Sequence, residues 1–181
     1  KLKKIYIIVS NSGSLVSKVL MLFTHQKYVH VTIALDKELK EAYSFGRKYT
    51  YVPLPGGFIN EKYDKRCKHF KNSYFRIYEL KVSNNKFKKL KNNLKNDYLI
   101  NKKKYKYNII GLYYIQRKKI LHRNKHLLCS QFCSKILIDN DILTFDKDYS
   151  LIKPEDFLNI ENTNVIYEGK TIDYLKIKNR I

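Results

Sequence analysis

The stretch from Leu127 to Ile138 constrains the fold of this 181-residue chain more than any other. Its apolar residues recur at the spacing of one helical face, which holds Cys129, Phe132, Cys133, Ile136 and Leu137. A helix with such a face needs a second layer that buries it. The stretch therefore predicts a helix that begins at Cys129, ends near residues 139–140 and packs against a sheet.

Short runs rich in β-branched and aromatic residues predict the strands of that sheet, at residues 1–10, 28–35, 40–45, 73–82 and 164–168. Helices are expected at 14–24 and 84–98, with another starting in 105–114 and a short one opened by Pro154. Residues 53–58 are expected to form an irregular loop, because proline and paired glycine disfavour regular structure. The pattern indicates a single α+β domain over residues 1–181, with a largely antiparallel sheet.

The formal charge of +21 would attract nucleic acid, anionic lipid or acidic polymer. Most of the excess is lysine scattered among Asn, Ile and Tyr, which is typical of an AT-rich genome. Arginines are few and no nucleic-acid motif is recognisable, so specific nucleic-acid binding is not expected. Peripheral contact with an anionic membrane or wall polymer is the partner that the charge favours.

No apolar run approaches the roughly 18 residues needed to cross a bilayer, so the chain is not expected to span one. Three cysteines without framework spacing favour a reducing compartment, and the cytoplasm is the expected location. The first ten residues carry an apolar stretch too short for a signal peptide. Export with a signal already removed stays open.

Cys129 is the candidate nucleophile because of its place at a helix start. Unpaired N–H groups there stabilise a thiolate and can lower a cysteine pKa from about 8.5 to roughly 3.5–7.5. Cys133, one turn further, is expected to fill the core, since cysteine is among the most buried residue types. Cys67 lies in a basic loop and is expected to be a surface thiol.

A nucleophile of this kind needs a base, and His30 is the candidate because it stands alone in a hydrophobic strand. A satisfied core histidine is an equal alternative. Glu41 on the adjoining strand is the candidate to orient the imidazole, and Asp36 is a weaker one. His122, His126 and Cys129 have a spacing that suits zinc, but the surrounding Arg and Lys make a poor cage for a cation, so no metal is expected.

Four segments in this order resemble a known family: Ser10–Ser14, the strand 28–35 with His30, Lys40-Glu41-Ala42, and Leu128-Cys129-Ser130-Gln131-Phe132. Together they resemble the circularly permuted papain-like branch of the NlpC/P60 superfamily, the YiiX/YebB-like amidases and hydrolases. The resemblance covers residues 5 to 170. It implies a small antiparallel sheet packed on the helix that carries the cysteine.

The resemblance further implies that Cys129 is the nucleophile, His30 the general base and acid, and Glu41 the group that orients His30. Ser44 or Tyr43 stay open for the last role, because a one-residue shift in register exchanges the faces of a strand.

The implied activity is hydrolysis of an amide or ester bond, in a cell-wall peptide or a lipid-linked substrate, without a cofactor. Acyl transfer is a variant of the same chemistry. The alternative from another class is a non-catalytic basic domain that binds anionic membrane or polymer surfaces. The sequence does not choose the substrate or the oligomeric state.

Overall fold

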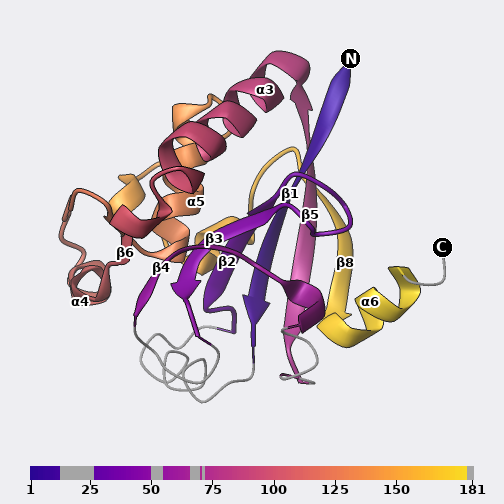
Figure 1. Cartoon of the computed structure of the whole chain (residues 1–181), viewed down its shortest axis with the longest axis horizontal. Coiled ribbons are helices and arrows are strands. Elements are labelled where there is room, and N and C mark those ends of the chain that lie inside the picture. The colour runs from indigo at the N-terminus through magenta and orange to yellow at the C-terminus, as the bar shows by residue number, and fades with distance from the viewer. Residues whose placement is uncertain (13–26, 50–54, 66–69, 71, 179–181) are drawn as a thin grey trace.

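A computed structural model describes residues 1–12, 27–49, 55–65, 70 and 72–178 (Figure 1). The helix expected at 14–24 lies outside the described residues, as do His25, Cys67 and His69. The remainder is of the mixed α+β class that the sequence predicts.

Six described strands form one antiparallel sheet in the order β4-β3-β2-β1-β5-β8. They are β1 (Leu2–Asn11), β2 (His30–Ala34), β3 (Ala42–Arg47), β4 (Gly56–Asn60), β5 (Tyr74–Ser83) and β8 (Asn164–Lys170). The two longest strands, β1 and β5, pair along their whole length in the middle of the sheet. The strands predicted near residues 1–10, 28–35, 40–45, 73–82 and 164–168 are thereby confirmed.

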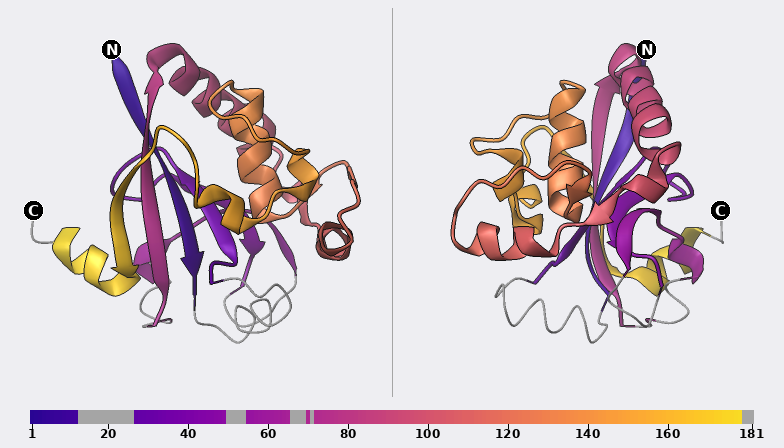
Figure 2. Two further views of the ribbon diagram at one scale, coloured as in Figure 1. Left: turned by 180° about the vertical axis from the view of Figure 1, so that it is seen from behind. Right: turned by 60° about the vertical axis from the view of Figure 1, so that its left-hand side comes forward.

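The helices lie on both faces of the sheet (Figures 1 and 2). One face of the sheet is covered by α3 (Asn84–Asn93) and α5 (Cys129–Asp139). Helix α3 continues into a π-helical turn at Leu94–Leu99. Before α5 come the short strand β6 (Lys106–Tyr107), α4 (Ile109–Gln116) and β7 (His126–Leu127), which pairs in parallel with β6. Single 3-10 turns lie at Lys102–Lys104, Tyr149–Leu151 and Pro154–Phe157, and α6 (Thr171–Lys178) covers the opposite face.

The central strand β1 is buried on both sides, and its alternation separates two cores. Ile5, Ile7 and Val9 face the larger core with α3 and α5, whereas Tyr6 and Ile8 face the smaller core beside α6. Because successive side chains of a strand point to opposite faces, one strand supplies both layers. The predicted packing of the Cys129 helix against an antiparallel sheet is confirmed.

The β2–β3 hairpin holds together at its turn and separates toward His30. Asp36 accepts hydrogen bonds from the N–H groups of Lys40 and Glu41 at 3.0 and 2.6 Å, which fixes the turn. The strands pair in register only at Ile33↔Tyr43 and Ala34↔Ala42. Beyond that point the Ser44 hydroxyl donates to the carbonyl of Val31 at 2.6 Å, in place of further ladder bonds.

The prediction of an irregular loop at residues 53–58 is wrong for Gly56–Phe58, and residues 53 and 54 lie outside the described residues. Gly56–Phe58 belong to β4, the edge strand, and pair with β3 from Phe45↔Phe58 to Arg47↔Gly56. The glycines serve close packing: a Cβ on Gly56 would lie 2.9 Å from Cβ of Tyr107, and one on Gly57 would collide with the carbonyl oxygen of Tyr105. Glycine in a strand marks such a close approach of backbones. It brings β6 against the sheet.

Candidate active site

Cys129 is the first residue of α5, as predicted, and its N-cap is Leu128. A leucine side chain has no oxygen that could accept hydrogen bonds from the first helical turn. The N–H groups of that turn therefore keep their capacity to stabilise negative charge at the sulfur or on a bound acyl oxygen. The start of α5 thus has no side-chain cap, and its N–H groups can donate to an anion.

A buried amide pair fixes this helix start. Gln131 Oε1 accepts from the backbone N–H of Leu128 at 3.0 Å and from Asn108 Nδ2 at 3.2 Å. Gln131 Nε2 donates to the carbonyl of Ser150 at 2.9 Å. Asn108 also caps α4 by accepting from the N–H of Gly111 at 3.1 Å. The starts of α4 and α5 are thus joined by side chains that are almost fully buried.

His30, the first residue of β2, lies between Cys129 and a carboxylate. Its Nε2 is 2.6 Å from Glu61 Oε1, and the side chains are only 13% and 3% exposed. Hydrogen bonding between the side chains of His30 and Cys129 shifts the pKa of both, so the two groups are neighbours. Because Nε2 is used by Glu61, Nδ1 is the nitrogen left to bond the sulfur. The three groups form the chain Glu61–His30–Cys129.

The charges of Glu61, His30 and Cys129 stabilise one another. Burial by itself lowers the pKa of His30, but hydrogen bonding to Cys129, the negative charge of Cys129 and then Glu61 outweigh it and raise that pKa to about 9. Burial likewise raises the pKa of Cys129, but His30 and backbone hydrogen bonds from Val31 and Ser130 outweigh it and lower that pKa. Each group therefore stabilises the charged form of the other, which favours a thiolate–imidazolium pair.

Glu41 does not occupy the position expected for the orienting group. Its carboxylate lies at the surface, 3.3 Å from Lys91 Nζ. Asp36 caps the hairpin turn. Ser44 is hydrogen-bonded to Val31, and the ring of Tyr43 stacks on Phe58. Each of the four is thus engaged elsewhere, and Glu61 is the carboxylate that bonds His30.

Glu61 is not predictable from local sequence patterns, because it follows a proline- and glycine-containing segment that is typical of a loop. Once Gly56–Asn60 is a strand antiparallel to β3, its next residue lies opposite Ala42, and Glu61 N–H indeed donates to the carbonyl of Ala42 at 2.7 Å. A lone acidic residue at the end of a glycine-rich edge strand is the signal that could have identified it.

Cys133 is a core residue, as expected. It is fully buried, its Sγ donates to the carbonyl of Val31 at 3.6 Å, and burial followed by the charges of Cys129 and Glu61 raises its pKa well above the ordinary value. The raised pKa favours the thiol form of Cys133, which lies one helical turn from Cys129.

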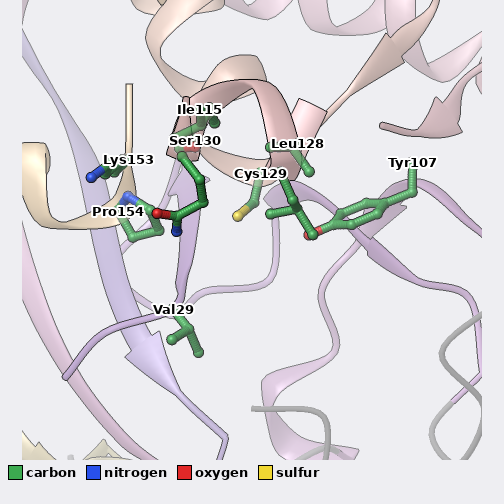
Figure 3. A pocket seen from close by; sticks show the side chains of 10 residues that line it. Val29, Tyr107, Ile115, Leu128, Cys129, Ser130, Lys153 and Pro154 are labelled. Carbon is green, nitrogen blue, oxygen red and sulfur yellow. The ribbon is translucent and has the colours of Figure 1, made fainter. Parts of the chain in front are cut away.

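The sulfur of Cys129 points into a cavity of about 50 Å³ (Figure 3). Its lining is mostly apolar: Val29, Leu112, Ile115, Leu128 and Pro154, with Tyr107, Gln116, Ser130 and Lys153 adding polar atoms. Tyr107 extends from β6 toward the sulfur, and burial followed by the charge of Cys129 raises its pKa far above the usual range. With about 10–15 Å³ per water position, the cavity has room for a few waters or a small acyl group.

The zinc arrangement considered for His122, His126 and Cys129 does not form. His122 Nε2 lies 3.0 Å from both carboxylate oxygens of Asp148, and His126 Nδ1 is bonded to the carbonyl of Asn124 at 2.8 Å. Within the described ranges, no group of three or more His, Cys, Asp or Glu side chains is arranged to hold a metal ion.

None of the helices in the described ranges combines the length and the apolar composition needed to cross a bilayer. Comparison of the chain with protein-family models, with curated proteins and with solved structures gives no match.

Proposed function

We propose that this protein is a cysteine hydrolase that cleaves an amide or ester bond by way of an acyl-enzyme on Cys129. The observation that supports it most is the buried chain Glu61–His30–Cys129, which ends in a sulfur exposed to a cavity. A histidine or cysteine that only fills a core needs neither a buried carboxylate partner nor a cavity beside the sulfur. A nucleophile, its base and an orienting carboxylate in this order are the parts that covalent acyl transfer requires.

In the first step, the Cys129 thiolate attacks the acyl carbon and the carbonyl oxygen becomes an oxyanion. The N–H groups at the start of α5 are the donors available to hold that charge. The imidazolium of His30 then gives its Nδ1 proton to the leaving amine or alcohol, and the carbon–heteroatom bond breaks. The acyl group remains on sulfur as a thioester.

In the second step, neutral His30 takes a proton from water, and the resulting hydroxide equivalent attacks the thioester. The C–S bond breaks, the acid is released and the thiolate–imidazolium pair is restored. Throughout, Glu61 holds Nε2–H and stabilises the imidazolium, which keeps Nδ1 directed at the sulfur. An alcohol or amine in place of water would turn hydrolysis into acyl transfer.

The fold supports the finer assignment to the permuted papain-like type as part of the same proposal. The histidine strand β2 precedes the cysteine helix α5 in the chain, and both belong to one core with an antiparallel sheet. This is the order that the resemblance to the YiiX/YebB-like hydrolases implies.

The experiment is to trap the acyl-enzyme. The protein is mixed with a p-nitrophenyl ester, quenched in acid and digested, and peptides are analysed by mass spectrometry. One acyl group on the peptide that contains Cys129, released by neutral hydroxylamine, is the expected result. Release of p-nitrophenol that is equally fast in Cys129→Ser would contradict the proposal. Cys133→Ala is the matched control and should acylate normally.

A further inference from the structure

The active-site cavity is bordered by a strongly basic part of the chain. Residues 98–138 contain no Asp or Glu, and their ten Lys or Arg residues are Lys102, Lys103, Lys104, Lys106, Arg117, Lys118, Lys119, Arg123, Lys125 and Lys135. Six of these lie before and after α4 in the sequence: three in the turn Lys102–Lys104, which precedes β6, and three at the C-terminal end of the helix, Arg117, Lys118 and Lys119. Such a concentration attracts anions to this side of the molecule.

Helix α4 itself is apolar on both sides. Leu112 and Ile115 line the cavity in front of Cys129. The opposite side exposes Ile109, Ile110 and Tyr113, whose exposed fractions are 47%, 51% and 60%. The solvent side of a surface helix is ordinarily polar, so a helix that is apolar all round implies a second apolar environment.

The position of α4 fits that environment. It lies at the margin of the molecule, away from the central sheet, and the basic segment that follows it runs along the same side (Figures 1 and 2). The guanidinium of Arg117 lies 5.4 Å from the ring centroid of Tyr113, so a positive charge borders the apolar side chains directly. A surface that accepts Ile109 and Ile110 would lie within one helix diameter of the cavity.

We propose that α4 inserts its exposed side into the interface of an anionic lipid bilayer, while the lysines and arginine at its two ends bind the lipid headgroups. The substrates of the proposed cysteine hydrolase would then be acyl chains of lipid amides or esters that enter the cavity from the bilayer. This second part rests on the proposed function, whereas the first part does not.

Other occupants fit these observations less well. A hydrophilic wall polymer would neutralise the lysines but leave Ile109 and Ile110 in water. A second copy of this chain would place two strongly basic segments against each other, and like charges oppose that contact. Apolar side chains within a basic rim are the composition of helices that lie in a membrane interface.

The binding test is sedimentation with vesicles of phosphatidylcholine alone or mixed with phosphatidylglycerol. We expect binding to the mixed vesicles only, weakened by salt because the headgroup contacts are screened. Ile109→Ser/Ile110→Ser should weaken it about tenfold or more, given that each buried apolar side chain contributes appreciably. Ile177→Ser, which alters an isoleucine 54% exposed on α6, is the matched control and should bind normally.

The charge contribution is tested with two double reversals of equal net charge. Lys103→Glu/Lys119→Glu, on either side of α4, should weaken binding about tenfold or more, since one lysine near the surface changes affinity about fivefold. Lys88→Glu/Lys95→Glu, on α3 and its π-helical extension, should have a small effect. Equal losses in both double variants would overturn the placement of the binding surface.

Hydrolysis separates the two proposals. The Ile109/Ile110 variant should keep its rate on a water-soluble short ester and lose its rate on a long-chain ester carried in mixed vesicles. Hydrolysis without vesicle binding would overturn the membrane inference and leave the hydrolase standing. Vesicle binding without turnover of any ester would overturn the hydrolase and the lipid substrate, and leave a membrane-binding domain. Binding only to anionic polymer, or self-association without vesicle binding, would also overturn the inference.

Discussion

Glu61 Oε1 lies 2.6 Å from His30 Nε2, although one residue follows the edge strand of the sheet and the other begins a strand two places away. Both side chains are nearly excluded from water, where an unpaired charge would be costly. Their pairing sets which nitrogen of His30 faces Cys129. The carboxylate therefore acts on the sulfur through the ring that separates them.

Glu61→Gln should lower kcat/KM about 10- to 1000-fold, because an amide stabilises the imidazolium less than a carboxylate does and no longer fixes the ring with charge. The pKa of His30 should fall, so the alkaline limb of the pH–rate profile moves to lower pH. Steady-state kinetics on a p-nitrophenyl ester as a function of pH measures both effects. Glu41→Gln is the control, and a loss of similar size there would show that the orienting carboxylate has been misassigned.

Cys133→Ala should retain nearly full activity and lose about 1 kcal/mol of stability, because a small buried side chain is removed from a packed core. Urea unfolding followed by circular dichroism gives the stability, and ester hydrolysis gives the activity. Loss of activity in a variant of unchanged stability would mean that the second cysteine takes part in the chemistry.

The rate should depend on pH as a bell. The lowered pKa of Cys129 places the thiolate on the acid limb, and kcat/KM rises as pH passes through it. Deprotonation of the imidazolium removes the proton needed by the leaving group, so kcat/KM falls as pH passes through about 9. An unpaired histidine would place that fall near pH 6.5 instead. Reactions without the protein, run at each pH, give the rate of spontaneous ester hydrolysis.

Gly57→Ala should destabilise the protein by about 2 kcal/mol, because the added Cβ meets the backbone of Tyr105, which cannot rotate away. Movement of β6 should also displace Tyr107 and raise KM. Gly46→Ala is the control within the same strand pair: its Cβ would meet the terminal Cδ1 of Ile59 at 3.0 Å, a flexible end. Its loss of stability, measured by urea unfolding, should be smaller. Equal losses would mean that the glycines have no part in seating β6.

The amino-acid pattern was sufficient for those elements whose periodicity is local. The helix face from Cys129 to Leu137 and the alternating strands around β1, β2 and β5 lie where the sequence places them. Cys129 at a helix start and His30 at the beginning of a strand follow from the same patterns. Their hydrogen bond is a consequence of packing α5 on β2, which both elements require to bury their apolar sides.

The position of Glu61 could not be predicted from local sequence patterns, because it depends on how β4 pairs with the rest of the sheet. The glycines of β4 look like a loop in isolation, and only their contact with β6 explains why they form an edge strand. Without that strand, Glu61 has no defined position and Glu41 is the nearest acidic residue in the adjoining hairpin. Strand pairing at the sheet edge decided between them.

The pH dependence of Cys129 alkylation tests the central claim, the thiolate–imidazolium pair, most directly. Iodoacetamide is added in limiting amounts from pH 5 to pH 9, and the modified peptides are quantified by mass spectrometry. We predict that Cys129 reacts at a nearly constant rate well below pH 8, faster than Cys133, and that His30→Ala makes its rate rise with an ordinary thiol pKa near 8.5. A wild-type Cys129 that reacts with that ordinary pKa, and no faster than in His30→Ala, would contradict the account.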